Sequence, residues 1–266
     1  MIGEPGPAPT PERPRRRADR LRLILELVDT EATSSVDELA EALAVSSATV
    51  RRDLAQLDSQ GLVVRSHGGA MRVDRGYELP IRYRETDRAA EKKRIAALAA
   101  TLAEDGAVVG VTGGTTTMEV ARALADRHGL TVLTNALNIG AELALRPNLR
   151  LVVTGGIARP ASFELSGPVA ERTIEEFNVD IAFVGVDGIS VRAGCTTHND
   201  WESLTNAALV RRAARVVVVA DRSKLGQVKF ARICNIADVD VLITDSEADP
   251  IEVAAIGAAG VDVRLA

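Results

Sequence analysis

The sequence contains few aromatic residues, few cysteines and no long apolar run. Phe, Trp and Tyr make up 3% of its 266 residues, which argues against a platform that stacks the bases of single-stranded nucleic acid. The two cysteines, Cys195 and Cys234, provide no disulfide framework and show no metal-ligand spacing with the three histidines. Neither a signal peptide nor a membrane span is recognisable. We therefore expect a cytoplasmic protein that has no metal, no cofactor and no membrane partner.

A strong positive charge is also missing. The net charge is −5, and the first 72 residues hold 10 Arg, no Lys and 11 acidic residues. Affinity for DNA would therefore have to come from local positive patches. The length and the hydrophobic content of 46% are sufficient for one small and one medium-sized domain with a sizeable core.

Residues 45–60 have the pattern of an amphipathic helix. Ser46 is a typical N-cap, because its hydroxyl can accept a hydrogen bond from the first helical turn. Val50, Leu54 and Leu57 follow at intervals that place them on one face. Gly61 is expected to end the helix.

The opposite face of this helix carries small residues and two arginines. At about 100° per residue, Ala48 and Arg52 point away from the apolar face, and Thr49 and Arg51 lie on its flanks. Such a face can approach DNA closely and offer guanidinium groups to guanine edges or to phosphates. Taken alone, the helix could equally be an ordinary amphipathic helix with a solvated charged face.

The residues around this helix favour the DNA-binding interpretation. An apolar helical pattern spans residues 20–29, and Ser35 and Glu38 form a capping box that opens a second helix. After the third helix, residues 62–65 have a short strand pattern and residues 67–69 a turn. This order predicts a winged helix-turn-helix domain over residues 19–72. The expected DNA contacts are Ser46, Ser47, Ala48, Thr49, Arg51, Arg52, Arg65 and His67.

Two further segments adjoin this domain. Residues 1–18 are rich in Pro and Gly and are predicted to be a disordered tail. The arginines at positions 13, 15, 16, 17 and 20 either touch phosphates or are solvated, and both interpretations stay open. Residues 73–89 are predicted to be a linker, and residues 90–266 a second domain.

The second domain has alternating strand and helix patterns. Strands are predicted at residues 108–111, 130–133, 151–153, 181–186, 216–220, 241–243 and 261–263, with helical patterns between most of them. This alternation predicts an α/β domain with a mostly parallel sheet covered on both faces. Ligands of such sheets bind outside the carboxyl ends of the strands.

Polar residues and glycines follow several of these strands. The run from Thr112 to Thr117 opens a helix, and its free N–H groups and hydroxyls can hold a phosphate, although no G-x-G-x-x-G or Walker A motif is present. Each run alone could be an ordinary turn or cap. Together they predict a pocket for a small polyhydroxylated anion. The candidate effector-binding residues are Gly114, Thr115, Thr116, Thr117, Thr134, Asn135, Gly155, Gly156, Asp187, Gly188, Glu202 and Lys224.

Several runs of residues match a known pattern. In the N-terminal part these are S-V-D-E-L-A-E-A-L-A-V-S-S-A-T-V-R-R-D-L and H-G-G-A, and in the C-terminal part G-G-T-T-T, V-T-G-G, G-C-T-T and V-V-V-V-A-D-R-S-K-L-G. On these runs the sequence resembles the DeoR family of bacterial transcriptional regulators over residues 19–250. Three positions depart from the family pattern. Thr112 and Gly113 stand where Asp and Ser are frequent, and His198 stands where Pro is frequent. The phosphate loop itself is intact.

The resemblance implies a fold and a function. The C-terminal domain is expected to be similar to ribose-5-phosphate isomerase, and the protein to be a sequence-specific regulator, a repressor of carbohydrate-metabolism genes. Its expected partners are a double-stranded DNA operator and a small phosphorylated sugar effector. Because one winged domain contacts few base pairs, we also expect a homo-oligomer, a dimer or larger.

Two other functions are compatible with parts of the sequence. An isomerase could use Asp187 or Glu202 as the base and Lys224 to stabilise an enediolate, but it would not need a winged domain. A constitutive DNA-binding protein would use its second domain only to assemble. We expect no enzymatic activity and no catalytic residue.

Overall fold

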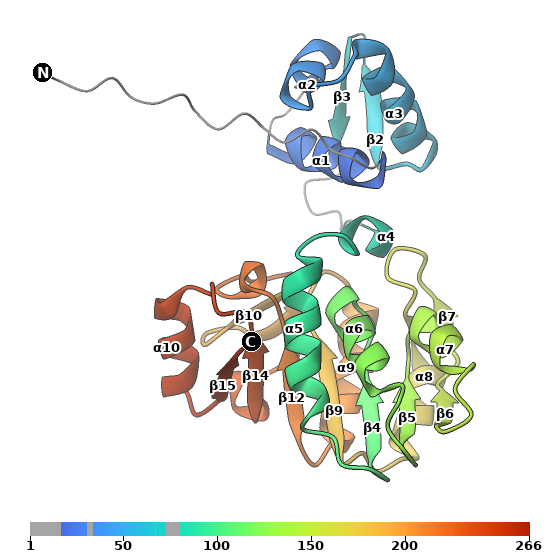
Figure 1. The fold of residues 1–266 in the computed structure, drawn as a ribbon, viewed down its shortest axis with the longest axis vertical. Helices are drawn as coiled ribbons and strands as arrows, with labels where there is room; N and C mark the ends of the chain where they lie inside the picture. The colour runs from blue at the N-terminus through green and yellow to red at the C-terminus, as the bar shows by residue number, and fades with distance from the viewer. Residues whose placement is uncertain (1–16, 31–33, 67, 73–79) are drawn as a thin grey trace, which may run out of the picture. The chain divides into compact units, whose positions relative to one another are not determined.

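The chain forms two compact units, Met1–Tyr77 and Glu78–Ala266 (Figure 1). The structure is a computed structural model that describes residues 17–30, 34–66, 68–72 and 80–266. The expected tail lies outside the described residues except for residues 17 and 18, which open the first helix. His67 also lies outside them. No helix within the described ranges is long and apolar enough to cross a membrane.

The first unit is the expected winged helix-turn-helix. Its elements are α1 (Arg17–Thr30), β1 (Ser34–Ser35), α2 (Val36–Ala42), α3 (Ser47–Ser59), β2 (Val63–Ser66) and β3 (Gly69–Arg72). The strands form an antiparallel sheet in the order β1-β3-β2. Ser35 and Glu38 form the predicted capping box of α2, and the Ser46 hydroxyl accepts from Thr49 N at 3.2 Å to cap α3. Val50, Leu54 and Leu57 are buried, as their spacing predicts.

One buried charge ties α1 to α3. Asp53 on α3 is 1% exposed. Its carboxylate accepts from Arg20 Nε at 2.5 Å and Nη2 at 3.3 Å, and from Arg17 Nε at 3.3 Å. The two arginines therefore supply the counter-charge that a buried carboxylate needs.

We expect Asp53→Ala to destabilise the first unit by about 2–4 kcal/mol, because it leaves the largely buried guanidinium of Arg20 without its partner. Chemical denaturation followed by circular dichroism measures this change. Asp58→Ala is the matched control: Asp58 lies on the same helix but is exposed, so its replacement should cost less than about 0.5 kcal/mol. Equal effects of the two substitutions would contradict the role assigned to Asp53.

The second unit is an α/β domain around a parallel sheet of seven strands, in the order β15-β14-β12-β9-β4-β5-β6. The sheet strands are β4 (Val108–Val111), β5 (Thr131–Thr134), β6 (Arg150–Val153), β9 (Ile181–Gly185), β12 (Val216–Val219), β14 (Val241–Thr244) and β15 (Asp262–Leu265). The helices are α4 (Ile81–Arg84), α5 (Ala89–Ala100), α6 (Thr115–Leu124), α7 (Leu137–Leu143), α8 (Pro168–Glu175), α9 (Asp200–Arg212) and α10 (Pro250–Ala258), with the 3-10 turns η1 (Arg222–Lys224) and η2 (Ile236–Asp238).

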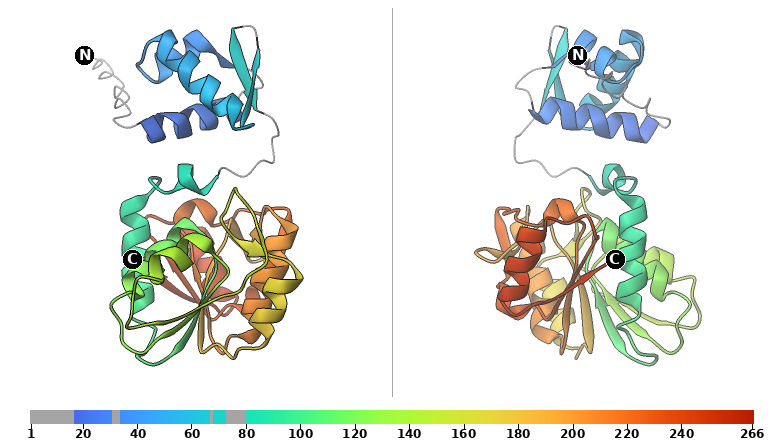
Figure 2. Two further views of the ribbon diagram at one scale, coloured as in Figure 1. Left: turned by 90° about the vertical axis from the view of Figure 1, so that its right-hand side faces the viewer. Right: turned by 60° about the vertical axis from the view of Figure 1, so that its left-hand side comes forward.

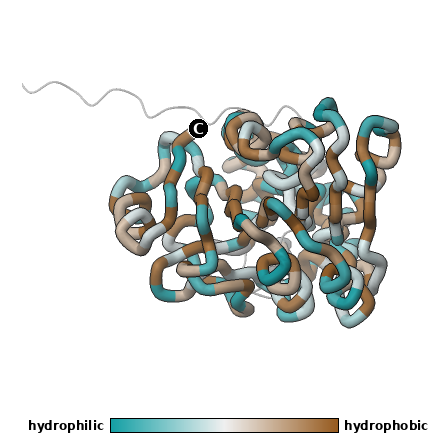
Figure 3. The backbone as a smooth tube through the Cα atoms, turned by 90° about the horizontal axis from the view of Figure 1, so that it is seen from below, coloured by the Kyte–Doolittle hydropathy of each residue, from teal (hydrophilic) through white to brown (hydrophobic). Residues whose placement is uncertain are grey.

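Helices cover both faces of this sheet (Figure 2). Alternate residues of β12 show the two faces: Val217 and Val219 pack in the apolar cluster that includes α5, α6 and α7, whereas Val216 and Val218 pack in the cluster that includes α8, α9 and α10. Figure 3 shows hydrophobic stretches of the backbone, in brown, in the interior of the second unit. The expected fold class, an N-terminal winged domain and a larger α/β domain, is confirmed.

Five short strands of the second unit lie outside its main sheet. β7 (Ile157–Ala158) pairs with β8 (Leu165–Ser166), and β10 (Gly188–Ser190), β11 (Gly194–Thr197) and β13 (Ala231–Cys234) form an antiparallel sheet of their own. These strands follow or interrupt the main crossovers, and they hold loops near the carboxyl ends of the main strands.

The linker differs from the predicted range of residues 73–89. Ile81 and Tyr83 on α4 are buried, and Ile81 N donates to Ala161 O at 2.7 Å. Residues from 80 onward therefore belong to the second unit. This segment has few apolar residues, but the side chains of Ile81 and Tyr83 are sufficient to pack the short helix α4 against the second unit.

Candidate functional site

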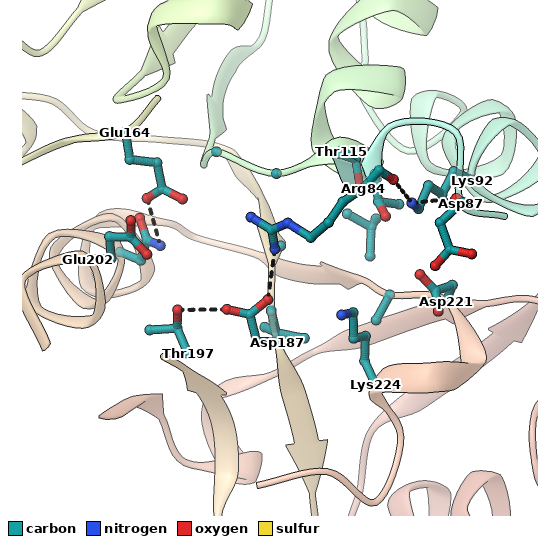
Figure 4. A pocket seen from close by; sticks show the side chains of 18 residues that line it. Arg84, Asp87, Lys92, Thr115, Glu164, Asp187, Thr197, Glu202, Asp221 and Lys224 are labelled. Atoms are coloured by element: carbon teal, nitrogen blue, oxygen red, sulfur yellow. Dashed lines mark hydrogen bonds and ion pairs between the residues drawn. The ribbon is translucent and has the colours of Figure 1, made fainter. Parts of the chain in front are cut away.

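A polar pocket lies at the point in the sheet where the chain stops adding strands on one side and begins to add them on the other. The chain runs from β4 through β5 to β6, then returns to place β9 on the other side of β4. Adjacent strands whose connections lead in opposite directions leave a crevice at their carboxyl ends. The pocket is lined by Arg84, Asp87, Lys92, Gly113, Gly114, Thr115, Thr116, Glu164, Gly185, Val186, Asp187, Thr197, Glu202, Asn206, Val219, Ala220, Asp221 and Lys224 (Figure 4).

The loop after β4 forms one wall of the pocket. Gly114 has φ 135°, a conformation that favours glycine, and it directly precedes α6. At Gly113 a Cβ would lie 2.3 Å from Glu164 Cγ, so only glycine leaves that carboxylate its place. The first N–H groups of α6 have no acceptor within the helix, and such a helix start attracts anions. This wall therefore suits a phosphate.

Basic side chains surround the phosphate wall. Lys92 on α5 is 3% exposed, and its Nζ donates to Arg84 O at 2.8 Å and to Asp87 O at 2.6 Å. Burial lowers the pKa of Lys92 to about 8, although the charges of Asp221 and Asp87 oppose this. Lys224 reaches the pocket from η1 beside Asp221 (Figure 4). Two lysine side chains therefore lie at this end of the pocket, beside the carboxylates of Asp87 and Asp221.

Asp187 lies at the centre, directly after β9. Its carboxylate accepts from Arg84 Nη1 at 3.1 Å and Thr197 Oγ1 at 3.0 Å, and it lies 2.9 Å from His198 Nδ1. Burial alone would raise the pKa of Asp187, but the hydrogen bond with His198 and the charges of Arg84 and Lys224 hold it below its usual range. Asp187 is therefore an anion that positions Arg84 and can accept from a ligand hydroxyl.

Asp221 is a second carboxylate held in its charged form. Burial opposes ionisation, but the hydrogen bonds from Ser223 and the charges of Lys224 and Lys92 lower the pKa of Asp221. The Asp221 carboxylate accepts from Ser223 N at 3.0 Å and Ser223 Oγ at 2.5 Å. It thereby keeps two ammonium groups at the same end of the pocket.

The opposite end of the pocket is built from carboxylates and amides (Figure 4). Glu202 Oε1 accepts from Arg159 Nη1 at 2.8 Å and from the Ser162 hydroxyl. Glu164 Oε2 accepts from Asn206 Nδ2 at 3.2 Å and from Asn135 Nδ2 at 3.1 Å. Oxygen acceptors of this kind recognise hydroxyl groups. The pocket therefore combines a place for a phosphate with a place for a polyol.

The structure brings many of the predicted effector residues together. Gly114, Thr115, Thr116, Asp187, Glu202 and Lys224 line the pocket. Asn135 lies behind it and reaches it through its hydrogen bonds to Glu164 and Asn206.

Of the predicted effector residues, all of which the structure describes, Thr117, Thr134, Gly155, Gly156 and Gly188 do not line the pocket. Thr134 Oγ1 instead donates to Val111 O at 2.7 Å and ties the ends of β5 and β4 together. Gly156 and Gly188 serve close backbone packing, since a Cβ would lie 2.8 Å from Ser166 O and 2.4 Å from Gln227 O respectively.

Several pocket residues were not foreseen. Arg84, Asp87 and Lys92 come from the predicted linker and the first helix of the second domain, Glu164 comes from the loop before β8, and Asn206 comes from α9. The burial of Lys92 could not be predicted from hydrophobic periodicity, because a lysine on an amphipathic helix is assigned to the solvent-exposed face. Thr197 and Asp221 belong to polar runs that the sequence places after strands, and both line the pocket.

The candidate DNA face is the exposed side of α3. Ala48, Arg51 and Arg52 are exposed there, and Arg65 is exposed on β2. The hydroxyls of the predicted Ser46, Ser47 and Thr49 have local partners: Ser47 Oγ donates to Asp37 Oδ1 at 2.9 Å, and Ser46 Oγ lies 2.9 Å from Thr49 Oγ1. These bonds fix the turn between α2 and α3, which leaves the arginines as the principal basic groups of this face.

A winged helix-turn-helix joined in one chain to an α/β unit with a charged pocket defines a DNA-binding regulator with a sensor domain. Residues 20–75 match the family described as DeoR-like helix-turn-helix domain, and residues 87–246 match the DeoR C terminal sensor domain. The chain belongs to the DeoR family of transcriptional regulators.

Curated relatives cover nearly the whole chain. The HTH-type transcriptional regulator GlpR of Haloferax volcanii is 38% identical over 247 residues, 92% of this chain and 96% of that protein. The glycerol-3-phosphate regulon repressor of Escherichia coli is 31% identical over 231 residues, 87% of this chain and 92% of that protein. Among solved structures, ribose 5-phosphate isomerase A of Methanocaldococcus jannaschii is 22% identical and covers 50% of this chain and 52% of its own, with a TM-score of 0.38. This last likeness has no bearing on activity.

Proposed function

We propose that the protein represses genes of carbohydrate metabolism and that a phosphorylated sugar bound in the pocket lowers its affinity for the operator. The observation that carries the proposal is the two-ended pocket: Lys92, Lys224 and the start of α6 suit a phosphate, and Glu164 and Glu202 suit hydroxyls. The relative named as a repressor of a glycerol-3-phosphate regulon supports a phosphorylated polyol as the effector class.

A mobility-shift assay tests this function. The probe is the DNA upstream of the protein's own gene, titrated with the full chain in the presence of a panel of phosphorylated sugars and their unphosphorylated counterparts. We expect specific binding that one phosphorylated compound weakens roughly 5- to 150-fold, the usual range of coupling between two sites. Binding that no phosphorylated compound changes would contradict the sensor role and favour a constitutive DNA-binding protein.

We further propose that the ligand is bound and not converted. The two carboxylates nearest the polyol end already accept hydrogen bonds from the protein. Arg159 and Ser162 donate to Glu202, and Arg84 and Thr197 donate to Asp187. A general base must instead reach a C–H proton of the substrate. Incubation of the active compound with the protein should therefore return it unchanged by NMR, whereas an isomerised product would support the enzyme alternative.

We propose a cytoplasmic homo-oligomer as the DNA-binding form. A single winged domain reads few base pairs, and symmetric dimers on repeated half-sites are the usual solution. Light scattering of the full chain, alone and on operator DNA, distinguishes a dimer or larger assembly from a monomer.

Anion binding in the pocket should weaken as the pH rises through about 8. Lys92 is charged below its lowered pKa of about 8 and neutral above it, so an anion loses one cationic neighbour. Sulfate is a suitable probe because its own charge is constant in this range. Between about pH 7 and about pH 9 we expect up to a roughly tenfold rise in Kd, following the loss of the protonated fraction. Lys92→Met should flatten the profile; an unchanged slope in that variant would assign the titration to another group.

A further inference from the structure

The only two cysteines of the chain lie opposite each other on neighbouring strands. Cys195 on β11 and Cys234 on β13 are direct partners in the antiparallel register, and both belong to one apolar cluster. The register shifts by one residue between Cys195 and Thr196, but the two cysteines themselves are opposed. Directly opposed residues of a regular antiparallel pair have Cα atoms about 4.5–5.5 Å apart, within the range of about 4.4–6.8 Å that a disulfide spans. Both thiols are free and buried. A covalent bond between them therefore requires only a small movement.

The two thiols differ in access and acidity. Cys195 is 0% exposed, whereas Cys234 is 7% exposed and lines a groove with Arg211 and Arg232. The interaction with the Cys195 thiol lowers the pKa of Cys234 against the effects of burial and of the charge of Asp238, and Arg232 adds to the lowering. The same interaction and burial raise the pKa of Cys195. A thiol of lowered pKa in the lining of a groove, beside a second thiol, is similar to the arrangement of redox-sensitive sites.

The cysteine pair is connected to the effector pocket through β11. The two residues after Cys195 both bind Asp187: Asp187 N donates to Thr196 O at 2.9 Å, and Thr197 Oγ1 donates to Asp187 Oδ2 at 3.0 Å. At Gly194, on the other side of Cys195, a Cβ would lie 2.1 Å from Cys234 O. The backbones are thus already in close contact there, so a movement of Cys195 is transmitted along the strand toward Asp187.

We propose that Cys195 and Cys234 form a reversible disulfide when the protein meets a hydroperoxide, and that this bond alters the anion pocket through β11. The Cys234 thiolate attacks a peroxide oxygen; an S–O bond forms, the O–O bond breaks, and the departing oxygen leaves as water or an alcohol. Cys195 Sγ then attacks Cys234 Sγ, and the hydroxyl leaves with the Cys195 proton as water. Two thiols and one peroxide thus give one disulfide and two molecules of water, or one of water and one of alcohol.

The test treats the purified full chain with hydrogen peroxide and measures its intact mass under non-reducing conditions. We expect the mass to fall by that of two hydrogen atoms, peptide mapping to join the segments that contain Cys195 and Cys234, and dithiothreitol to restore both thiols. Because the chain holds two cysteines, any intramolecular disulfide is this pair. Unchanged thiols, or a disulfide only between chains, would overturn the proposal.

Two variants test the order of the steps. In Cys195→Ala the sulfenic acid on Cys234 has no resolving thiol, so dimedone should trap it on this variant. In Cys234→Ser the buried Cys195 should stay unlabelled. Equal labelling of the two variants would overturn the assignment of Cys234 as the reacting thiol. The wild-type mass measurement stands even if one variant fails to fold.

The effect on the pocket rests on the proposed function, and a separate readout tests it. Sulfate affinity of the disulfide form and of the reduced form should differ roughly fivefold or more, as expected for coupled sites, and Cys234→Ser should show no change on treatment. A disulfide that forms without changing sulfate affinity would overturn the link through β11. If neither form binds sulfate, the phosphate pocket itself is wrong, whereas the cysteine chemistry is judged by mass alone.

Discussion

Arg52→Ala is expected to weaken operator binding by roughly 5- to 150-fold, the equivalent of the about 1–3 kcal/mol that one arginine–guanine contact contributes. Arg52 lies on the exposed side of α3, beside Arg51 and the small Ala48. Its Nε donates to Ala48 O at 3.3 Å, a contact within the helix, and no acidic side chain among the described residues forms an ion pair with it. Because the side chain is exposed, alanine should leave the first unit folded.

The salt dependence of binding separates two ways in which Arg52 could act. Loss of a base contact should relax the sequence preference and leave the slope of the logarithm of the binding constant against the logarithm of the salt concentration nearly unchanged. Loss of a phosphate contact should weaken binding to all sequences alike and reduce the magnitude of that slope by about one. Arg150→Ala, a change at an exposed position on β6 in the second unit, is the matched control and should bind as the parent does. A folded Arg52→Ala protein with full affinity would exclude this face of α3 from the interface.

The fold of the first unit could be predicted because its signals are local. Caps at Ser35 and Ser46 and the apolar spacing of Val50, Leu54 and Leu57 fix where the helices begin and which side is buried. The burial of Asp53 was not predicted from the sequence. Its burial depends on arginines of another helix, 33 and 36 residues earlier in the chain, and no local pattern encodes such a pair.

The pocket could be predicted in part for a topological reason. The carboxyl ends of parallel strands meet at one edge of the sheet, so Gly114 and Asp187 could be placed together without knowing the strand order. The contact between Arg84 and Asp187 joins residues 103 positions apart, and it depends on where α4 packs. Glycines after strands were less informative, because Gly156 and Gly188 serve close packing outside the pocket.

Lys224→Met is expected to shift the response to the phosphorylated effector to a much higher effector concentration while operator binding stays normal. Lys224 lines the pocket beside Asp221 and faces the phosphate wall (Figure 4). A hydrogen bond to a charged group contributes about 1.5–3 kcal/mol, so effector affinity should fall roughly 10- to 150-fold. Methionine keeps the length of the side chain, and Lys224 is only partly buried, so the fold should be preserved.

The measurement for Lys224→Met is an effector titration of the operator complex, with Lys93→Met as the control. Lys93 neighbours the buried Lys92 on α5 but is exposed, so its loss changes the net charge equally without touching the pocket. A ligand can shift DNA affinity only through a difference in its binding to the two states of the protein. Lys224→Met should therefore respond only at a higher effector concentration, in proportion to its weaker effector binding. At saturating effector it should still be released fully from the operator. If Lys224→Met responds at the parent's concentration, the phosphate does not lie at this end of the pocket.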